Sequence, residues 1–144
     1  MSDAFSRSTA LFSCVEVKPA SGDRTEAENQ LAIWMAFSLR KKMQLACRVG
    51  LASKENLVEP CFAIVGHQVY FYLAYMGSQG DTVHILVPEL GPLGLCETGT
   101  VSGIFRTLRL WRNAIRYGRG EGSDGFWGGL METLLQKLAG VVDD

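Results

Sequence analysis

The stretch Leu11-Phe-Ser-Cys-Val-Glu-Val-Lys18 carries the pattern that decides how this chain folds. Its alternation predicts a β-strand over residues 11–17, and a long helical pattern follows shortly after it. Alternation puts Glu16 and Lys18 on one face of that strand, roughly 6.6 Å apart along the chain. A carboxylate there can ligate a hard cation or accept a proton, and an ammonium can stabilise developing negative charge. A surface ion pair on an edge strand is the alternative interpretation.

The remaining chain divides into helical and strand patterns. Further strands are predicted at residues 61–65, 69–75 and 83–87. Helices are predicted at residues 25–49, 101–117 and 126–139, and loops at residues 51–60, 88–94 and 118–125. We therefore expect one α+β domain over residues 1–144, of the three-layer α/β type. It should contain an antiparallel-rich mixed sheet of about four strands, with the Glu16 strand central and helices flanking it.

Apolar residues at helical spacing predict which helix faces are buried. In the first helix the predicted inward residues are Ala27, Leu31, Trp34 and Met35, and the apolar surface is widened by Ile33, Phe37 and Leu39. In the next helix they are Ile104, Leu108, Trp111 and Ile115. In the last helix they are Trp127, Leu130, Met131, Leu134 and Leu138.

Several of these segments together resemble the fungal branch of the PD-(D/E)XK nuclease-like proteins. The resemblance rests on Val15-Glu-Val-Lys-Pro19, on residues 22–28 and 30–35, on Val65-Gly-His67, on residues 102–112 and on Phe126-Trp-Gly128. It implies a nuclease-like fold in which Glu16 and Lys18 form the second half of the active-site motif. It also implies that Gln30 and Trp34 correspond to the Gln-x-x-x-Tyr helix motif of the RecB-like branch.

The sequence departs from that family before the Glu16 strand. The resemblance implies a metal-binding Asp on the preceding strand, yet Asp3 is the only acidic residue before Glu16. Asp3 is either a ligand or part of a frayed terminus. A divalent ion held by one carboxylate and waters is bound too weakly for metal-activated hydrolysis. We therefore expect a fold truncated at the amino terminus, with no metal and no cofactor, and Mg²⁺ only if the chain is a working nuclease.

Composition limits the functional classes. Hydrophobic residues make up 47% of the chain and charged residues 20%, which is typical of soluble globular proteins. Four cysteines (Cys14, Cys47, Cys61 and Cys96) lack metal-ligand spacing, and no apolar run is long enough to span a membrane. We expect a cytoplasmic protein without a membrane partner. A net charge of −1 makes nucleic acid a disfavoured partner, and any such contact would be local.

Arginines recur along residues 101–117. Arg106, Arg109, Arg112 and Arg116 form a stripe with no acidic residue among them. Such a stripe is either a solvated basic face or a track for anions and phosphates. We assign Arg106 and Arg109 to substrate binding.

Aromatic and imidazole side chains complete the candidate site. Tyr70 and Tyr72 share one strand face, and with Trp34 they are predicted to bind substrate next to Glu16. His67 lies at a hairpin turn, where it is either a turn residue or a proton-transfer group. His84 lies in an apolar strand and is predicted to be a hydrogen-bonded core residue.

Three functions from different classes fit these features. We favour a degenerate nuclease-fold enzyme that acts on a small organic substrate by metal-free acid/base chemistry, an isomerase or cyclase type suited to a biosynthetic pathway. Its catalytic residues would be Glu16, Lys18, Gln30 and His67. The second is a Mg²⁺-dependent nuclease completed by Asp3 or a partner subunit. The third is a noncatalytic interaction module, and the last helix could serve as a homodimer contact.

Overall fold

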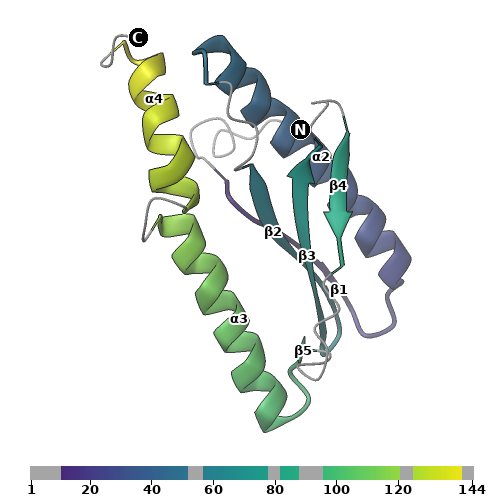
Figure 1. Ribbon diagram of the computed structural model, residues 1–144. Coiled ribbons are helices and arrows are strands. Elements are labelled where there is room, and N and C mark those ends of the chain that lie inside the picture. The colour runs from purple at the N-terminus through teal and green to yellow at the C-terminus, as the bar shows by residue number, and fades with distance from the viewer. Residues whose placement is uncertain (1–10, 52–56, 78–81, 88–95, 121–124, 141–144) are drawn as a thin grey trace.

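A twisted sheet between helical layers forms the centre of the molecule. The computed structural model describes residues 11–51, 57–77, 82–87, 96–120 and 125–140. Helix α2 (Arg24–Arg48) covers one face of the sheet and helix α3 (Val101–Arg119) covers the other (Figure 1). The C-terminal helical segment consists of η3 (Trp127–Met131) and α4 (Glu132–Leu138), and it packs with α2 in the larger core. This confirms the predicted α+β fold class.

The sheet is mixed, as predicted. Its strand order is β1 (Cys14–Lys18), β2 (Val58–Val65), β3 (Gln68–Met76) and β4 (Val83–Leu86). β1 and β2 run parallel because α2 returns the chain between them, whereas β2, β3 and β4 form an antiparallel meander. A short strand, β5 (Cys96–Glu97), also pairs with β3 and was not predicted.

The predicted central position of the Glu16 strand is wrong for the part of the chain that is described. There, β1 pairs only with β2 and lies at one end of the sheet. Val15 and Val17 point away from α2 and are 45% and 64% exposed. The prediction assumed that strands on both sides of β1 would help to cover these valines. With β2 as its one neighbour in the described residues, β1 leaves them open to solvent.

Two loop boundaries also differ from the prediction. β2 begins at Val58, so Glu59 and Pro60 belong to the strand and not to a loop. Helix α3 runs to Arg119 and ends at Gly120, whose φ of 70° is the left-handed conformation common after helices. The predicted loop at residues 88–94, and Asp3, lie outside the described residues.

Helix α2 starts and packs largely as its sequence predicts. The Asp23 side chain accepts a hydrogen bond from the Thr25 backbone N–H, which caps the helix. Ala27, Leu31 and Met35 are buried as expected. Trp34, by contrast, is 56% exposed, and Ile33 and Phe37 are exposed as well, so the predicted wide burial of α2 is wrong. Only one narrow face of the helix meets the sheet.

Helix α3 buries a different stripe from the one predicted. Ile104, Leu108, Trp111 and Ile115 are exposed. The sheet is instead met by Gly103, Thr107, Leu110 and Ala114. The two stripes differ by one residue, which is a rotation of about 100° about the helix axis. Small residues are favoured on the buried side because they let the helix approach the sheet closely.

The last helical segment agrees in part with its predicted stripe. Leu130, Met131 and Leu134 are buried in the larger core, while Trp127 and Leu138 are exposed.

His84 on β4 is also exposed, and its ring stacks on Tyr75 with 5.1 Å between ring centroids. Its predicted place in the core is therefore wrong, because this face of β4 has no helix over it among the described elements.

No helix in the described ranges has the length and apolar character that a membrane crossing needs.

The close approach at Gly103 can be tested by a single methyl group. A Cβ at Gly103 would lie 2.2 Å from the Glu97 carbonyl oxygen. We expect Gly103→Ala to lower the free energy of unfolding by about 1–3 kcal/mol, because this clash outweighs the better helix propensity of alanine. Urea denaturation measures the change. The control is Gly99→Ala, where no atom lies within 4 Å of the new Cβ. Equal stability of both variants would contradict the close packing.

Candidate functional site

Glu16 and Lys18 meet the first turns of α2 in one polar network. The Lys18 Nζ atom lies 3.0 Å from Glu26 Oε1 and 3.5 Å from Glu16 Oε1. Gln30 donates a hydrogen bond of 3.1 Å to the same Glu26 oxygen. We call Glu16, Lys18, Glu26 and Gln30 the Lys18 network. The structure thus brings together three residues that the sequence singled out, and Glu26 links them.

Local geometry explains why these side chains converge. Glu16 and Lys18 share the face of β1 that looks toward α2, and Glu26 and Gln30 lie one helical turn apart. A tight turn joins the two elements, with the Gly22 N–H donating to the Pro19 carbonyl at 2.8 Å. Gly22 is needed there, since a Cβ would lie 2.7 Å from the Lys18 Cβ. The turn therefore delivers the start of α2 directly over Lys18.

The ammonium group is the positive centre of this network. The hydrogen bond to Glu26 is the largest cause that raises the pKa of Lys18 above its ordinary value, although partial burial acts in the opposite direction. Lys18 is therefore protonated at neutral pH. It can donate a proton or stabilise an anion, but it is not a base.

A second polar group lies on the other side of β2, where β3 faces α2. Tyr72 donates a hydrogen bond of 2.5 Å to Glu28 Oε1, and Arg24 Nε lies 2.8 Å from that same oxygen. The Arg24 guanidinium also stacks over the Tyr70 ring at 4.0 Å. Burial is the main cause that raises the pKa of Tyr72 to about 12. The tyrosines thus contact Arg24 and Glu28, whereas Glu16 contacts Lys18.

The other predicted site residues are dispersed. Trp34 lies one turn beyond Gln30 on α2, exposed to solvent. His67 lies in the β2–β3 turn, which is held near β1 by the Gly66 N–H donating to the Lys18 carbonyl. Its ring Nδ1 lies 3.5 Å from Thr98 Oγ1. Arg106 and Arg109 are on α3, across the sheet from the Lys18 network.

Sequence reasoning missed a buried ion pair at the far end of α2. Lys42 pairs with Glu59, and their side chains are 9% and 3% exposed. Ser38 donates to Glu59 at 2.9 Å and accepts from Lys42 at 3.1 Å, and the Lys42 ammonium also donates to the Leu11 carbonyl. Burial lowers the pKa of Lys42, against the attraction of Glu59. The sequence held one signal, because Lys42 follows Leu31, Met35 and Leu39 at helical spacing.

A comparison with known protein families identifies the superfamily of this chain. The family model of the PD-(D/E)XK nuclease superfamily matches residues 2–122. The chain therefore belongs to the PD-(D/E)XK nuclease superfamily. Neither a curated protein nor a solved structure matches it.

This family implies a divalent metal, so the donor set must be compared with that requirement. Glu16 and Glu26 are two carboxylates close enough to share one cation, and Glu26 was not considered in the expectation of a single ligand. Both of them, however, are engaged by Lys18, and Glu26 also accepts from Gln30. Within the described ranges no three His, Cys, Asp or Glu side chains form a group that could hold a metal. The residues described here do not fit a metal centre.

The buried pair gives a clear prediction for stability. Lys42→Met leaves Glu59 charged, buried and without its ion-pair partner, so we expect a loss of about 3–5 kcal/mol in the free energy of unfolding. Guanidinium denaturation measures it. The neighbouring Lys41 is exposed, and Lys41→Met should stay within about 0.5 kcal/mol of the unsubstituted protein. Comparable losses in the two variants would contradict a specific role for Lys42.

Proposed function

We propose that this chain is a PD-(D/E)XK-fold enzyme that performs metal-free acid/base chemistry on a small organic substrate, of the isomerase or cyclase type. The observation that carries the proposal is the position of the Lys18 ammonium. It lies between the Glu16 and Glu26 carboxylates, 3.5 and 3.0 Å from their oxygens, where a cation would otherwise bridge them. The site thus contains its own positive charge.

We infer different roles for the two carboxylates from their contacts. The contacting oxygen of Glu26 already accepts hydrogen bonds from Lys18 and Gln30, so this residue holds the ammonium in place. Glu16 is more weakly engaged, at 3.5 Å, and its side chain is partly open to solvent. Glu16 is therefore the better proton acceptor. Gln30 acts as a positioning residue through Glu26.

The chemistry follows from these roles. Glu16 removes a proton from the carbon between the carbonyl group and the C=C bond of a β,γ-unsaturated ketone. The electron pair of that C–H bond forms a new C=C bond, and the π pair of the carbonyl moves to its oxygen. The Lys18 ammonium stabilises the resulting enolate. The enolate is conjugated with the second C=C bond, so return of the proton from Glu16 to the γ-carbon shifts the double bond and completes an isomerisation. A positioned acid or base of this kind contributes about 10² to 10⁴ in rate.

An organic substrate would find apolar surface nearby. Trp34 lies one turn beyond Gln30, and Ile33 and Phe37 are exposed on the same helix. Exposed apolar side chains beside a polar group are a common feature of sites for organic ligands. A catalytic role for His67 stays a prediction, because its ring Nδ1 lies beside Thr98 Oγ1 and not beside a member of the Lys18 network.

A Mg²⁺-dependent nuclease is the second candidate. The position of Glu26 favours a nuclease, because displacement of the Lys18 ammonium would leave the Glu16 and Glu26 carboxylates facing a site that a metal ion could occupy. The superfamily membership favours it as well. It would still require a further ligand from outside the described residues.

Deuterium exchange tests the proposed chemistry without knowledge of the natural substrate. A panel of 1,3-dicarbonyl compounds and enones is incubated with the protein in D₂O containing EDTA, and loss of the C–H signals is followed by proton NMR. We expect protein-dependent exchange that falls by about 10² or more in Glu16→Gln and in Lys18→Met.

The matched control is Glu132→Gln, an exposed carboxylate on α4 that should exchange like the unsubstituted protein. Absence of exchange above the buffer rate, or equal rates in all variants, would count against the proposal. Mg²⁺-dependent cleavage of DNA that is lost in Glu16→Gln would favour the nuclease.

A further inference from the structure

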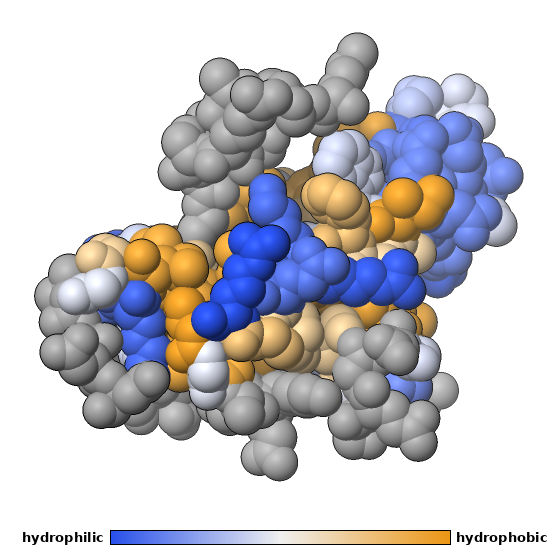
Figure 2. All heavy atoms as spheres, turned by 90° about the horizontal axis from the view of Figure 1, so that it is seen from above, coloured by the Kyte–Doolittle hydropathy of each residue, from blue (hydrophilic) through white to orange (hydrophobic). Residues whose placement is uncertain are grey.

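Helix α3 exposes a broad apolar stripe beside its buried face. Val101, Phe105 and Leu108 are 72%, 68% and 58% exposed, and Ile104, Trp111 and Ile115 are exposed too. The side of the helix that meets the sheet is formed instead by Gly103, Thr107, Leu110 and Ala114. Figure 2 shows that hydrophobic side chains reach the surface beside hydrophilic ones elsewhere on the molecule as well. On α3 they form one continuous stripe.

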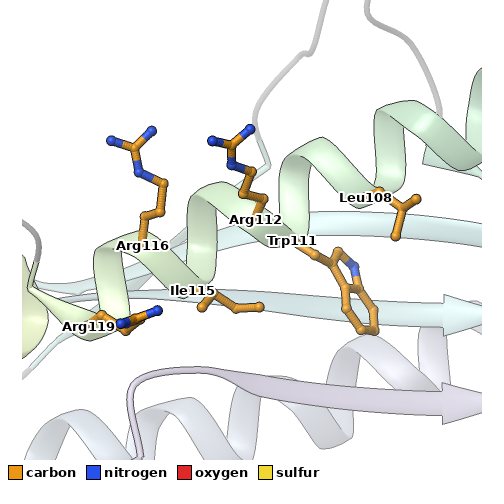
Figure 3. A pocket seen from close by; sticks show the side chains of 6 residues that line it. All are labelled: Leu108, Trp111, Arg112, Ile115, Arg116 and Arg119. Carbon is orange, nitrogen blue, oxygen red and sulfur yellow. The ribbon is translucent and has the colours of Figure 1, made fainter.

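The C-terminal half of this stripe lines an open groove of about 570 Å³. The groove is lined by Leu108, Trp111, Arg112, Ile115, Arg116 and Arg119. Figure 3 shows Leu108, Trp111 and Ile115 on one side of the helix, while Arg112 and Arg116 extend from the other side. Trp111 is steadied by Phe62 beneath it, with ring centroids 5.9 Å apart. The groove therefore combines an apolar floor with a guanidinium border.

The charge of the groove is of one sign. Helix α3 contains five arginines and no acidic residue over Val101–Arg119. Guanidinium groups pair with carboxylates through planar, two-pronged hydrogen bonds, and they do so best when the partner groups are held at fixed spacing. An apolar ligand with carboxylates along its edge would satisfy both parts of the groove.

We propose that the α3 groove binds an amphipathic helix of a partner protein whose apolar stripe is bordered by Asp and Glu. Apolar side chains spaced three and four residues apart would pack on Leu108, Trp111 and Ile115, as in other helix-in-groove complexes. The acidic residues of the partner would face Arg112 and Arg119. This surface is across the sheet from the Lys18 network and is independent of its chemistry.

Charge and shape favour this occupant over others. Two copies of α3 packed face to face would bring arginines against arginines, which disfavours a symmetric contact through this surface. All the residues that line the groove belong to α3, so the groove runs along the side of one helix, where the ridge of a second helix can pack. A phosphate backbone would match the arginines but would leave the apolar floor against a hydrated, charged ligand.

Fluorescence anisotropy with designed peptides tests the proposal. The probe is a labelled helical peptide of 19 residues, the length of α3, with Leu at spacings of three and four residues and Glu along both borders. The comparison peptide carries Lys in place of Glu. We expect the Glu peptide to bind about tenfold more tightly or better, with an affinity that falls as salt increases.

Variants of the protein locate the binding surface. Arg112→Glu and Leu108→Ser should each weaken binding by about tenfold, since both residues line the groove. Arg106→Glu is the matched control: it makes the same charge change on the same helix outside the groove, and binding should stay unchanged. Equal binding of the two peptides, no binding of either, or an equal effect of Arg106→Glu would overturn the proposal. The proposal would also be overturned if duplex DNA or phosphatidylserine vesicles bind, if Arg112→Glu abolishes that binding, and if the Glu peptide does not bind.

Discussion

The contact of one ammonium group with two carboxylates holds the edge strand against its crossover helix. Lys18 on β1 reaches Glu26 on α2 at 3.0 Å and Glu16 on its own strand at 3.5 Å. The backbone carbonyl of Lys18 also accepts from Gly66 and thereby fixes the β2–β3 turn. Strand, helix and turn therefore converge on a single residue. The Gly22 turn sets the course of α2, and the contacts of Lys18 then fix how the side chains of the candidate site are arranged.

Helix α2 is fastened to the sheet by lysine–glutamate pairs near both of its ends, and burial makes the two pairs different. The Lys18 network is partly open to solvent, so its pairs contribute little to stability but can meet a ligand. Lys42 and Glu59 are enclosed, and removal of either partner would leave a buried charge. The exposed contacts of Lys18 are suited to ligand binding, whereas the buried Lys42–Glu59 pair is suited to holding α2 in a fixed position. The apolar residues between them supply most of the burial.

The sequence predicted the positions of the helices and strands well, but it predicted which helix faces are buried only in part. The reasons are physical. Strong periodicity located α2 and the meander, and the Glu-x-Lys alternation predicted that Glu16 and Lys18 share a face. On α3 the apolar stripe at Leu108 points to solvent because close packing selected Gly103 and its neighbours instead. Periodicity shows that a helix is amphipathic, but it does not show which partner covers the apolar side. Glu26 could not be assigned from sequence alone, since its contact depends on how the turn at Gly22 folds.

The Lys18 ammonium lies between two carboxylates, at the position that a bridging metal ion would take in this PD-(D/E)XK fold. Calorimetric titration with Mn²⁺ shows whether the ammonium excludes such an ion. We expect no low-micromolar binding by the unsubstituted protein. We expect tighter binding after Lys18→Met, because Glu16 and Glu26 are then freed to share the ion. Low-micromolar binding by the unsubstituted protein that disappears in Glu16→Gln would show instead that the chain is a metal-dependent nuclease.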